Sequence, residues 1–183
     1  MHPRLAELFS YLDTERRALR QTLDAIPEHD RNARPATDRW SVRDILEHLV
    51  NVERRVVAAV ASAIAQAKDA GLEPEQERSS VVNDADRAKY LDRSRKLSAP
   101  PRTHPASSDD AEVLWTALEE VRASLKAAAL TGDGLALGRV TQPHPFFGPL
   151  SVYEWLALMA GHEARHADQM REVAALVKTP VTE

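Results

Sequence analysis

The sequence predicts an all-α fold: a four-helix bundle with a long crossover between its second and third helices. Apolar residues recur every three, four or seven positions over four stretches, about 3–25, 41–68, 109–130 and 151–177, and this period places side chains on one face of a helix. The proline-rich connection 71–110 separates the second stretch from the third. No stretch combines the alternating pattern with the Asn-Gly turn typical of a β-hairpin, so we expect no strand.

The first two helices have clear start and stop signals. The first is expected to end before Pro27, because proline cannot continue a helix. The second is expected to begin after Ser41, which can cap the helix N-terminus, and Asp44 can return a hydrogen bond as in a capping box. Ile45 and Leu49 then begin the inward-facing stripe of this helix.

The connection between the second and third helices is long enough to carry the chain back along the bundle. We therefore expect these two helices to run parallel rather than to form a hairpin. Within the connection, only VVNDADRAKYLDR (81–93) could form a short helical turn. The third helix is expected to be capped by Ser108 or Asp109, and the fourth by a capping box of Ser151 and Glu154.

Composition and charge limit the function classes. At 183 residues, the chain is expected to form a single domain, residues 1–183, with one core. Its 24 basic and 28 acidic side chains are interspersed and give a net charge of −4, so we expect no nucleic-acid partner. The absence of cysteine excludes disulfides, thiolate nucleophiles and sulfur ligands from this chain. The charged N-terminal segment predicts neither a signal peptide nor a membrane span, and we expect a soluble, cytoplasmic protein.

The inward face of the fourth helix contains two histidines. His162 and His166 are four residues apart, a difference of about 40° around a helix, so both rings can point to one place inside the bundle. Each buried polar group without a partner costs about 1–3 kcal/mol, and a divalent metal ion would satisfy both imidazoles. The full inward seam is Val152, Trp155, Met159, His162, His166, Gln169, Val173 and Leu176.

A third ligand has to come from another helix. His48 is the candidate, because it lies beside Ile45 and Leu49 on the inward stripe of the second helix. Among the other histidines, only His144 is close enough in sequence to the fourth helix to compete as a ligand. Those at the terminus or near a proline are His2, His29 and His104. Three histidine ligands leave at least one coordination position open, as catalysis requires.

The stretch 162–166 also has the H-E-x-x-H spacing of zinc peptidases. A peptidase needs a further downstream ligand and an edge strand that holds the peptide, and the sequence offers neither, so this class is not favoured. The alternative that the three histidines are ordinary helix residues with hydrogen-bonding neighbours stays open. Glu163, Asp44 and Gln169 are unranked candidates for orienting a ligand or moving a proton, and Asp44 could also accept a hydrogen bond from His48.

Four motifs resemble those of the DinB superfamily. They are RWSVRDILEHL in the second helix, PPR before the third, HPFFGPL before the fourth and GHEARHADQ within the fourth. The histidine of the first motif and the H-x-x-x-H-x-x-Q pattern of the last are the most specific parts. The resemblance extends from Leu5 to Leu176.

The resemblance implies a metal ion held near one end of the bundle by three histidines, which match His48, His162 and His166 here. Zinc is expected first, with nickel or iron as alternatives for the same nitrogen ligands. The resemblance also implies frequent homodimers and, for part of the superfamily, transferase or hydrolase reactions that use low-molecular-weight thiols. We therefore expect a metal-dependent enzyme with a small-molecule substrate or such a thiol, and the alternative is a non-catalytic binding protein or dimeric scaffold of the same fold. The 144–148 connection could cap the site, although a structural turn is the simpler interpretation.

Overall fold

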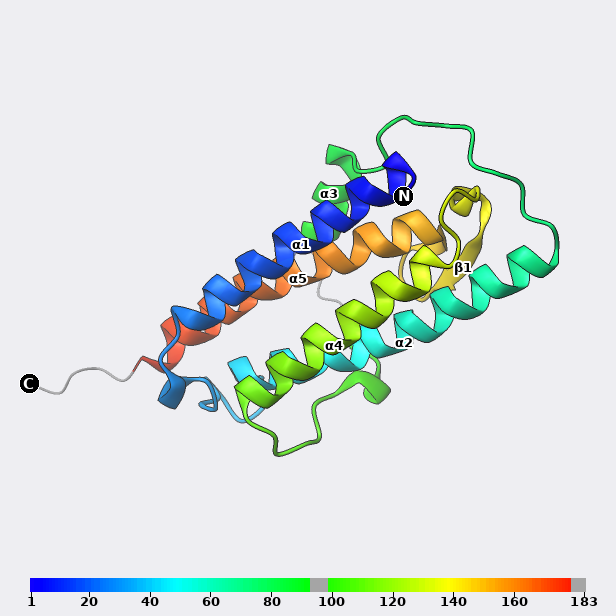
Figure 1. Ribbon diagram of the computed structural model, residues 1–183. Coiled ribbons are helices and arrows are strands. Elements are labelled where there is room, and N and C mark those ends of the chain that lie inside the picture. Colours follow the sequence, from blue (N-terminus) through cyan, green and yellow to red (C-terminus); the bar gives the residue numbers. More distant parts are fainter. Residues whose placement is uncertain (93–98, 179–183) are drawn as a thin grey trace, which may run out of the picture.

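The computed structural model describes residues 1–92 and 99–178, and the predicted four-helix bundle with its long crossover is confirmed (Figure 1). The four long helices are α1 (Pro3–Asp24), α2 (Val42–Asp69), α4 (Ala111–Leu130) and α5 (Val152–Val177). A short helix, α3 (Asp84–Leu91), lies within the crossover. Short 3-10 turns occur at Glu28–Asp30, Pro101–Thr103 and Leu137–Arg139.

The long helices form two parallel pairs, α1 with α5 and α2 with α4 (Figure 1). Near the start of α1, Arg4 lies over the ring of Tyr153, which is near the start of α5. Near the end of α1, Thr22 accepts a hydrogen bond from Arg171 of α5. The α2 and α4 pair is parallel because the crossover returns the chain to the end of the bundle at which α2 began.

Two helix starts follow the capping signals of the sequence. Ser41 and Asp44 form the capping box of α2, and Ser151 and Glu154 form that of α5, with both reciprocal hydrogen bonds present in each. These bonds satisfy backbone N–H groups that have no partner within the first turn of a helix.

The start of α4 requires a correction. Its N-cap is Asp110, whose side chain accepts hydrogen bonds of 3.0 Å from the backbone N–H groups of Glu112 and Val113. The expected caps, Ser108 and Asp109, lie one or two residues too early. Ser108, Asp109 and Asp110 all have side chains suited to capping, so sequence alone does not distinguish between them.

The expectation that the chain contains no strand is wrong between α4 and α5. There, β1 (Thr141–His144) pairs antiparallel with β2 (Gly148–Ser151), and Pro143 faces Pro149 in register. Proline usually interrupts a strand, but each strand of a two-stranded ribbon has a free edge that tolerates a residue without an N–H. Gly148 turns the chain with a φ of +77°, a conformation that other residues rarely adopt.

Helix α3 packs against α5 and corresponds to the helical turn expected within 81–93. Its Tyr90 is buried, and a Cβ added at Gly161 of α5 would lie 2.7 Å from the Cβ of Tyr90. The two helices therefore touch where α5 has no side chain. Arg93, the last residue of the expected turn, lies outside the described residues.

The apolar core consists of two clusters, one in each half of the bundle. Fully buried leucines of the first cluster include Leu8, Leu125 and Leu156, and those of the second include Leu23, Leu46 and Leu118. Leu176, which was expected on the inward seam of α5, is instead 60 % exposed. Since Thr22 already lies beside Arg171, α1 has ended before the last turn of α5 and cannot cover it.

A layer of four buried charges separates the two apolar clusters, with one residue from each long helix. We call Arg16 of α1, Glu53 of α2, Arg122 of α4 and Glu163 of α5 the charge quartet, and each is at most 6 % exposed. Arg16 Nη2 lies 2.5 Å from Glu163 Oε1 and 3.1 Å from Glu53 Oε2. Arg122 lies 2.9 Å from Glu163 and 2.5 Å from Glu53. The two positive and two negative charges therefore neutralise one another inside the bundle.

The arginines of the quartet also join α1 to α4. Arg16 donates a hydrogen bond of 2.9 Å to the carbonyl oxygen of Leu118, and Arg122 donates one of 3.1 Å to the carbonyl oxygen of Leu12. Guanidinium groups suit this role because they offer several donors in a fixed plane.

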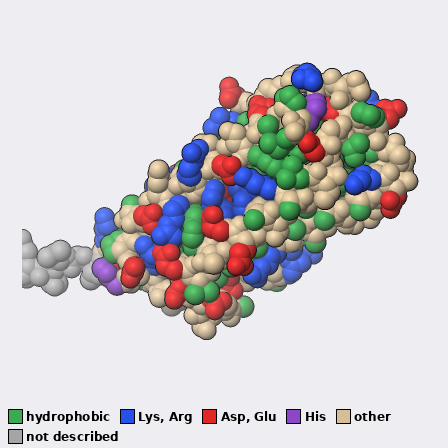
Figure 2. All heavy atoms as spheres, viewed as in Figure 1, with side chains coloured by type: hydrophobic (Ala, Val, Ile, Leu, Met, Phe, Trp, Pro, Cys, Tyr) green, Lys and Arg blue, Asp and Glu red, His purple; other side chains and the backbone are tan. Residues whose placement is uncertain are grey.

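At the surface in Figure 2, acidic and basic side chains are interspersed, as they are along the sequence. Within the described part of the chain, no helix combines the length and the apolar composition needed to cross a membrane.

Candidate metal centre

The structure brings together the three histidines that the sequence selected. His48 of α2 and His162 and His166 of α5 each offer a ring nitrogen, and these three atoms lie within 4.8 Å of one another. The ring centroids are 4.5 Å apart for His162 and His166, and 5.0 and 5.4 Å from His48 to His166 and His162. His48 and His166 are buried, and His162 is half-buried.

Hydrogen bonds fix the tautomers of two of these rings. The Nδ1 of His48 lies 3.0 Å from the carbonyl oxygen of Thr103, and the Nδ1 of His166 lies 2.7 Å from Oε1 of Gln169. Both oxygens can only accept, so each Nδ1 carries the proton and each Nε2 keeps its lone pair. In both rings the nitrogen available as a ligand is therefore Nε2.

Burial keeps two of the rings neutral. Desolvation lowers the pKa of His48 below its ordinary value, and the positive charge that His104 would carry lowers it further, against the opposing effect of the Thr103 carbonyl. Desolvation also lowers the pKa of His162 well below its ordinary value, with further lowering by His166 and His48. Neutral imidazole is the form that binds a metal ion.

The spacing of the two ring nitrogens on α5 matches that of two ligands on a single ion. Two nitrogen ligands on a tetrahedral zinc ion lie about 3.3 Å apart, because Zn–N bonds are about 2.0–2.1 Å long. The Nε2 atoms of His162 and His166 are 3.1 Å apart. A group of three histidines of this kind could hold a divalent metal ion, and its donor atoms do not distinguish zinc from nickel or iron.

Comparison with known proteins identifies the family. Residues 11–170 match the sequence profile of the DinB superfamily. The chain belongs to this superfamily. It is 29 % identical over 152 residues to the uncharacterised protein YuaE of Bacillus subtilis (strain 168), and the alignment covers 82 % of this chain and 87 % of YuaE.

A solved structure has the same fold as this DinB chain. The crystal structure of TT2238, a four-helix bundle protein, is similar with a TM-score of 0.60 and 21 % identity, and the match covers 92 % of this chain and 98 % of that one. At this identity the similarity shows the fold alone, because function depends on the residues that a fold carries rather than on the fold itself.

Gln169, Asp44 and Glu163, the candidates for orienting a ligand or moving a proton, lie in different surroundings. Gln169 contacts the ring of His166 and orients it. Asp44 does not contact His48, since its carboxylate accepts hydrogen bonds from the backbone of Ser41 and from arginine side chains, and the ring nitrogen of His48 is bound by Thr103 instead. Glu163 belongs to the charge quartet.

Sequence reasoning missed the contribution of Thr103 to this DinB site. Its carbonyl is a backbone group, so its residue type carries no signal. The only hint is the pair of prolines before it in PPRTH, since Pro101–Thr103 forms a 3-10 turn that fixes the direction of the carbonyl groups.

His144, the competing ligand, is the last residue of β1 and is not part of the three-histidine group. Its Nδ1 accepts hydrogen bonds of 3.1 and 3.3 Å from the backbone N–H groups of Phe146 and Phe147. Its ring stacks on Phe147 with centroids 4.8 Å apart and lies 5.0 Å from the ring of Trp155. Burial, with the nearby charge of Lys89, lowers the pKa of His144 to about 4.

This shift predicts a pH dependence of stability that His144→Asn would reduce. As the pH decreases from about 6.5 to 4, the unfolded chain takes up a proton at His144 and the folded chain does not. The free energy of unfolding therefore decreases as the pH decreases. An asparagine oxygen can accept the same turn N–H groups but does not titrate. The free energy of unfolding, measured with denaturant at several pH values in this range, should depend less steeply on pH in the variant. The difference in slope should correspond to at most about one proton per chain. Equal pH dependence in the wild type and His144→Asn would contradict the lowered pKa of His144. His29→Asn is the control, because the ring of His29 is exposed.

Proposed function

We propose that this DinB chain is a metal-dependent enzyme in which His48, His162 and His166 hold one divalent ion. Zinc is the first candidate, with nickel or iron as alternatives. The observation that carries the proposal is the state of the ring nitrogens. Thr103 and Gln169 hold the Nδ1–H groups of two rings, so that two Nε2 lone pairs lie beside the third imidazole inside the bundle.

The reaction that we propose is a thiol-dependent transfer or a hydrolysis. When bound, a divalent ion lowers the pKa of a coordinated water or thiol, which supplies the nucleophile near neutral pH. In the transferase form, a thiol RSH and an electrophile R′X give RSR′ and HX. In the hydrolase form, water takes the place of the thiol and the products are R′OH and HX. Because the chain has no cysteine, the thiol enters as a small-molecule substrate.

The surroundings of Glu163 argue against the peptidase alternative. A zinc peptidase uses the glutamate of H-E-x-x-H as its general base. Here Glu163 is 1 % exposed, and its Oε1 lies within hydrogen-bonding distance of Arg16 and Arg122. This oxygen is already engaged by two guanidinium groups inside the bundle, so we do not assign proton transfer to this residue.

Metal analysis of the untagged protein tests the proposal. We expect about one divalent ion per chain in the wild type and little or none in His48→Ala or His162→Ala, because two histidines alone form a weak site. His29→Ala is the matched control, since its ring is exposed and distant from the group in sequence. A wild type that takes up no ion from zinc, nickel or iron solutions would contradict the proposal.

Turnover separates the enzyme from the scaffold alternative. Low-molecular-weight thiols tested with a chloronitrobenzene electrophile should give a thioether product with the wild type, and His162→Ala should abolish it while its circular dichroism stays helical. Metal uptake without turnover of either thiol or ester substrates would favour a non-catalytic binding protein.

A further inference from the structure

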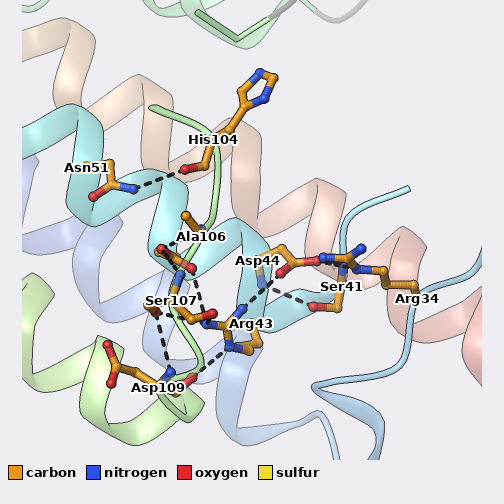
Figure 3. Close-up of polar contacts among 10 residues, drawn as sticks. Arg34, Ser41, Arg43, Asp44, Asn51, His104, Ala106, Ser107 and Asp109 are labelled. Atoms are coloured by element: carbon orange, nitrogen blue, oxygen red, sulfur yellow. Dashed lines mark hydrogen bonds and ion pairs between the residues drawn. The ribbon is translucent and has the colours of Figure 1, made fainter. Parts of the chain in front are cut away.

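One face of α2 holds the loop that precedes α4. Arg43 and Glu47 of α2 bond to the loop between residues 106 and 109, and Asn51, further along α2, donates to the carbonyl oxygen of His104 at 3.5 Å (Figure 3). Between these contacts, Nδ1 of His48 lies 3.0 Å from the carbonyl oxygen of Thr103. The orientation of the His48 ring therefore depends on where this loop lies, because its partner is a loop carbonyl.

Glu47 makes the central contact with the loop. Its Oε1 accepts hydrogen bonds of 2.8 Å from the backbone N–H groups of both Ala106 and Ser107. The side chain is buried, 6 % exposed, and it is the residue immediately before His48. A buried carboxylate that receives two N–H groups fixes the backbone at that point, since leaving those groups without partners would be costly.

Arg43, one turn earlier on α2, completes the contact. It donates to Glu47 Oε2 at 3.1 Å, to the hydroxyl of Ser107 at 2.9 Å and to the carbonyl oxygen of Asp109 at 2.6 Å (Figure 3). Its remaining nitrogen donates to Asp44 at 3.0 Å. Each nitrogen of this guanidinium is thus engaged, which fixes its plane.

We propose that Arg43 and Glu47 form a loop clamp whose function is to position the metal ligand His48. The clamp fixes residues 106–109, and the short segment back to Thr103 then places its carbonyl oxygen 3.0 Å from Nδ1 of His48. A carbonyl accepts only from the Nδ1–H tautomer, the one that leaves Nε2 for a metal ion. Glu47 and Arg43 are positioning residues, and this role rests on the proposed function.

The test compares Glu47→Ala and Glu47→Gln in the full-length protein. The tautomer of His48 is measured by nitrogen-15 NMR of the imidazole in metal-free protein, and zinc affinity by competition with a chromophoric chelator. Glu47→Ala should give a mixture of tautomers and weaken zinc binding by roughly 10- to 100-fold. Glu47→Gln should have a smaller effect, because its amide oxygen can still accept from the two loop N–H groups.

Glu7→Ala is the matched control. Glu7 is also a helix carboxylate that holds the crossover, accepting a hydrogen bond of 2.9 Å from the backbone N–H of Val81, but it lies on α1. Its loss should leave the His48 tautomer and the zinc affinity unchanged. If Glu47→Ala does not fold, Arg43→Gln weakens the same loop through Ser107 and Asp109 and should likewise mix the tautomers.

Two outcomes separate this inference from the proposed function. A wild-type protein that binds no zinc would overturn the proposed function, whereas the tautomer measurement would still decide whether the clamp orients His48. A folded Glu47→Ala that keeps a pure Nδ1–H tautomer, with zinc affinity within about twofold of the wild type, would overturn the clamp alone.

Discussion

Replacing Glu163 with alanine is expected to lower the free energy of unfolding by about 3–5 kcal/mol. The substitution removes one of the two negative charges of the charge quartet, and Arg16 and Arg122 then share Glu53 alone in a layer that is at most 6 % exposed. Removing one partner of a buried ion pair costs far more than the intact pair contributes, because the other charge stays away from water without compensation. Both arginines lose a partner here, since Glu163 Oε1 lies 2.9 Å from Nε and 2.5 Å from Nη2 of Arg16, and 2.9 Å from Nη2 of Arg122.

Glu119→Ala is the control for this prediction. Its carboxylate also pairs with Arg16, at 3.0 Å, but its side chain is 52 % exposed, so the expected loss is at most about 1 kcal/mol. Glu163→Gln keeps an acceptor oxygen and should lie between the two. Denaturant unfolding at neutral pH measures all three variants. Equal losses for Glu163→Ala and Glu119→Ala would show that the buried layer contributes no more than a surface ion pair.

Gly161→Ala is expected to destabilise the protein by about 1–3 kcal/mol, the usual cost of overpacking. In an open helix this substitution would be stabilising by about 1 kcal/mol, because glycine is a poor helix former. Here the added Cβ would lie 2.7 Å from Cβ of Tyr90, a distance that real Cβ atoms do not reach, and Cβ of Tyr90 can move only if α3 moves. Steric overlap therefore outweighs helix propensity.

A double-mutant cycle checks that the cost arises from this contact. Tyr90→Gly removes the opposing Cβ, so Gly161→Ala should be neutral or stabilising in that background. Hydrogen exchange should show faster exchange in α3 of Gly161→Ala while the α2 and α4 amides are unchanged. An additive cycle would mean that the two residues do not interact.

The helices and the grouping of the three histidines could be predicted because both follow from the helical spacing of inward-facing residues, which recur every three or four positions. His48, His162 and His166 occupy positions at which apolar residues would continue the inward stripe, and a polar residue there needs an explanation. The charge quartet had a similar signal in the sequence, since its two arginines also lie on inward stripes. Arg16 lies four residues after Leu12 and three before Leu19, and Arg122 has the same relation to Leu118 and Leu125. Charged residues at such positions predict a buried ion network, with partners on other helices.

The rest of the site could not be predicted because it consists of backbone groups and irregular segments. The carbonyl oxygen that orients His48 comes from Thr103, and the N–H groups that Glu47 holds come from Ala106 and Ser107. These groups are present in almost every residue type, so only the path of the loop gives them a role. The β1–β2 hairpin was missed for a related reason, since Pro143 and Pro149 are read as breaks unless the pairing is known.

The charge quartet has a consequence for the order of folding. Its corners are at residues 16, 53, 122 and 163, so during synthesis Arg16 emerges from the ribosome long before Glu163. Until that last glutamate arrives, α1, α2 and α4 together carry two arginines and one glutamate of the layer, and burying them would enclose an unmatched positive charge. The nascent bundle is therefore expected to stay hydrated at its centre, and to close only when α5 docks.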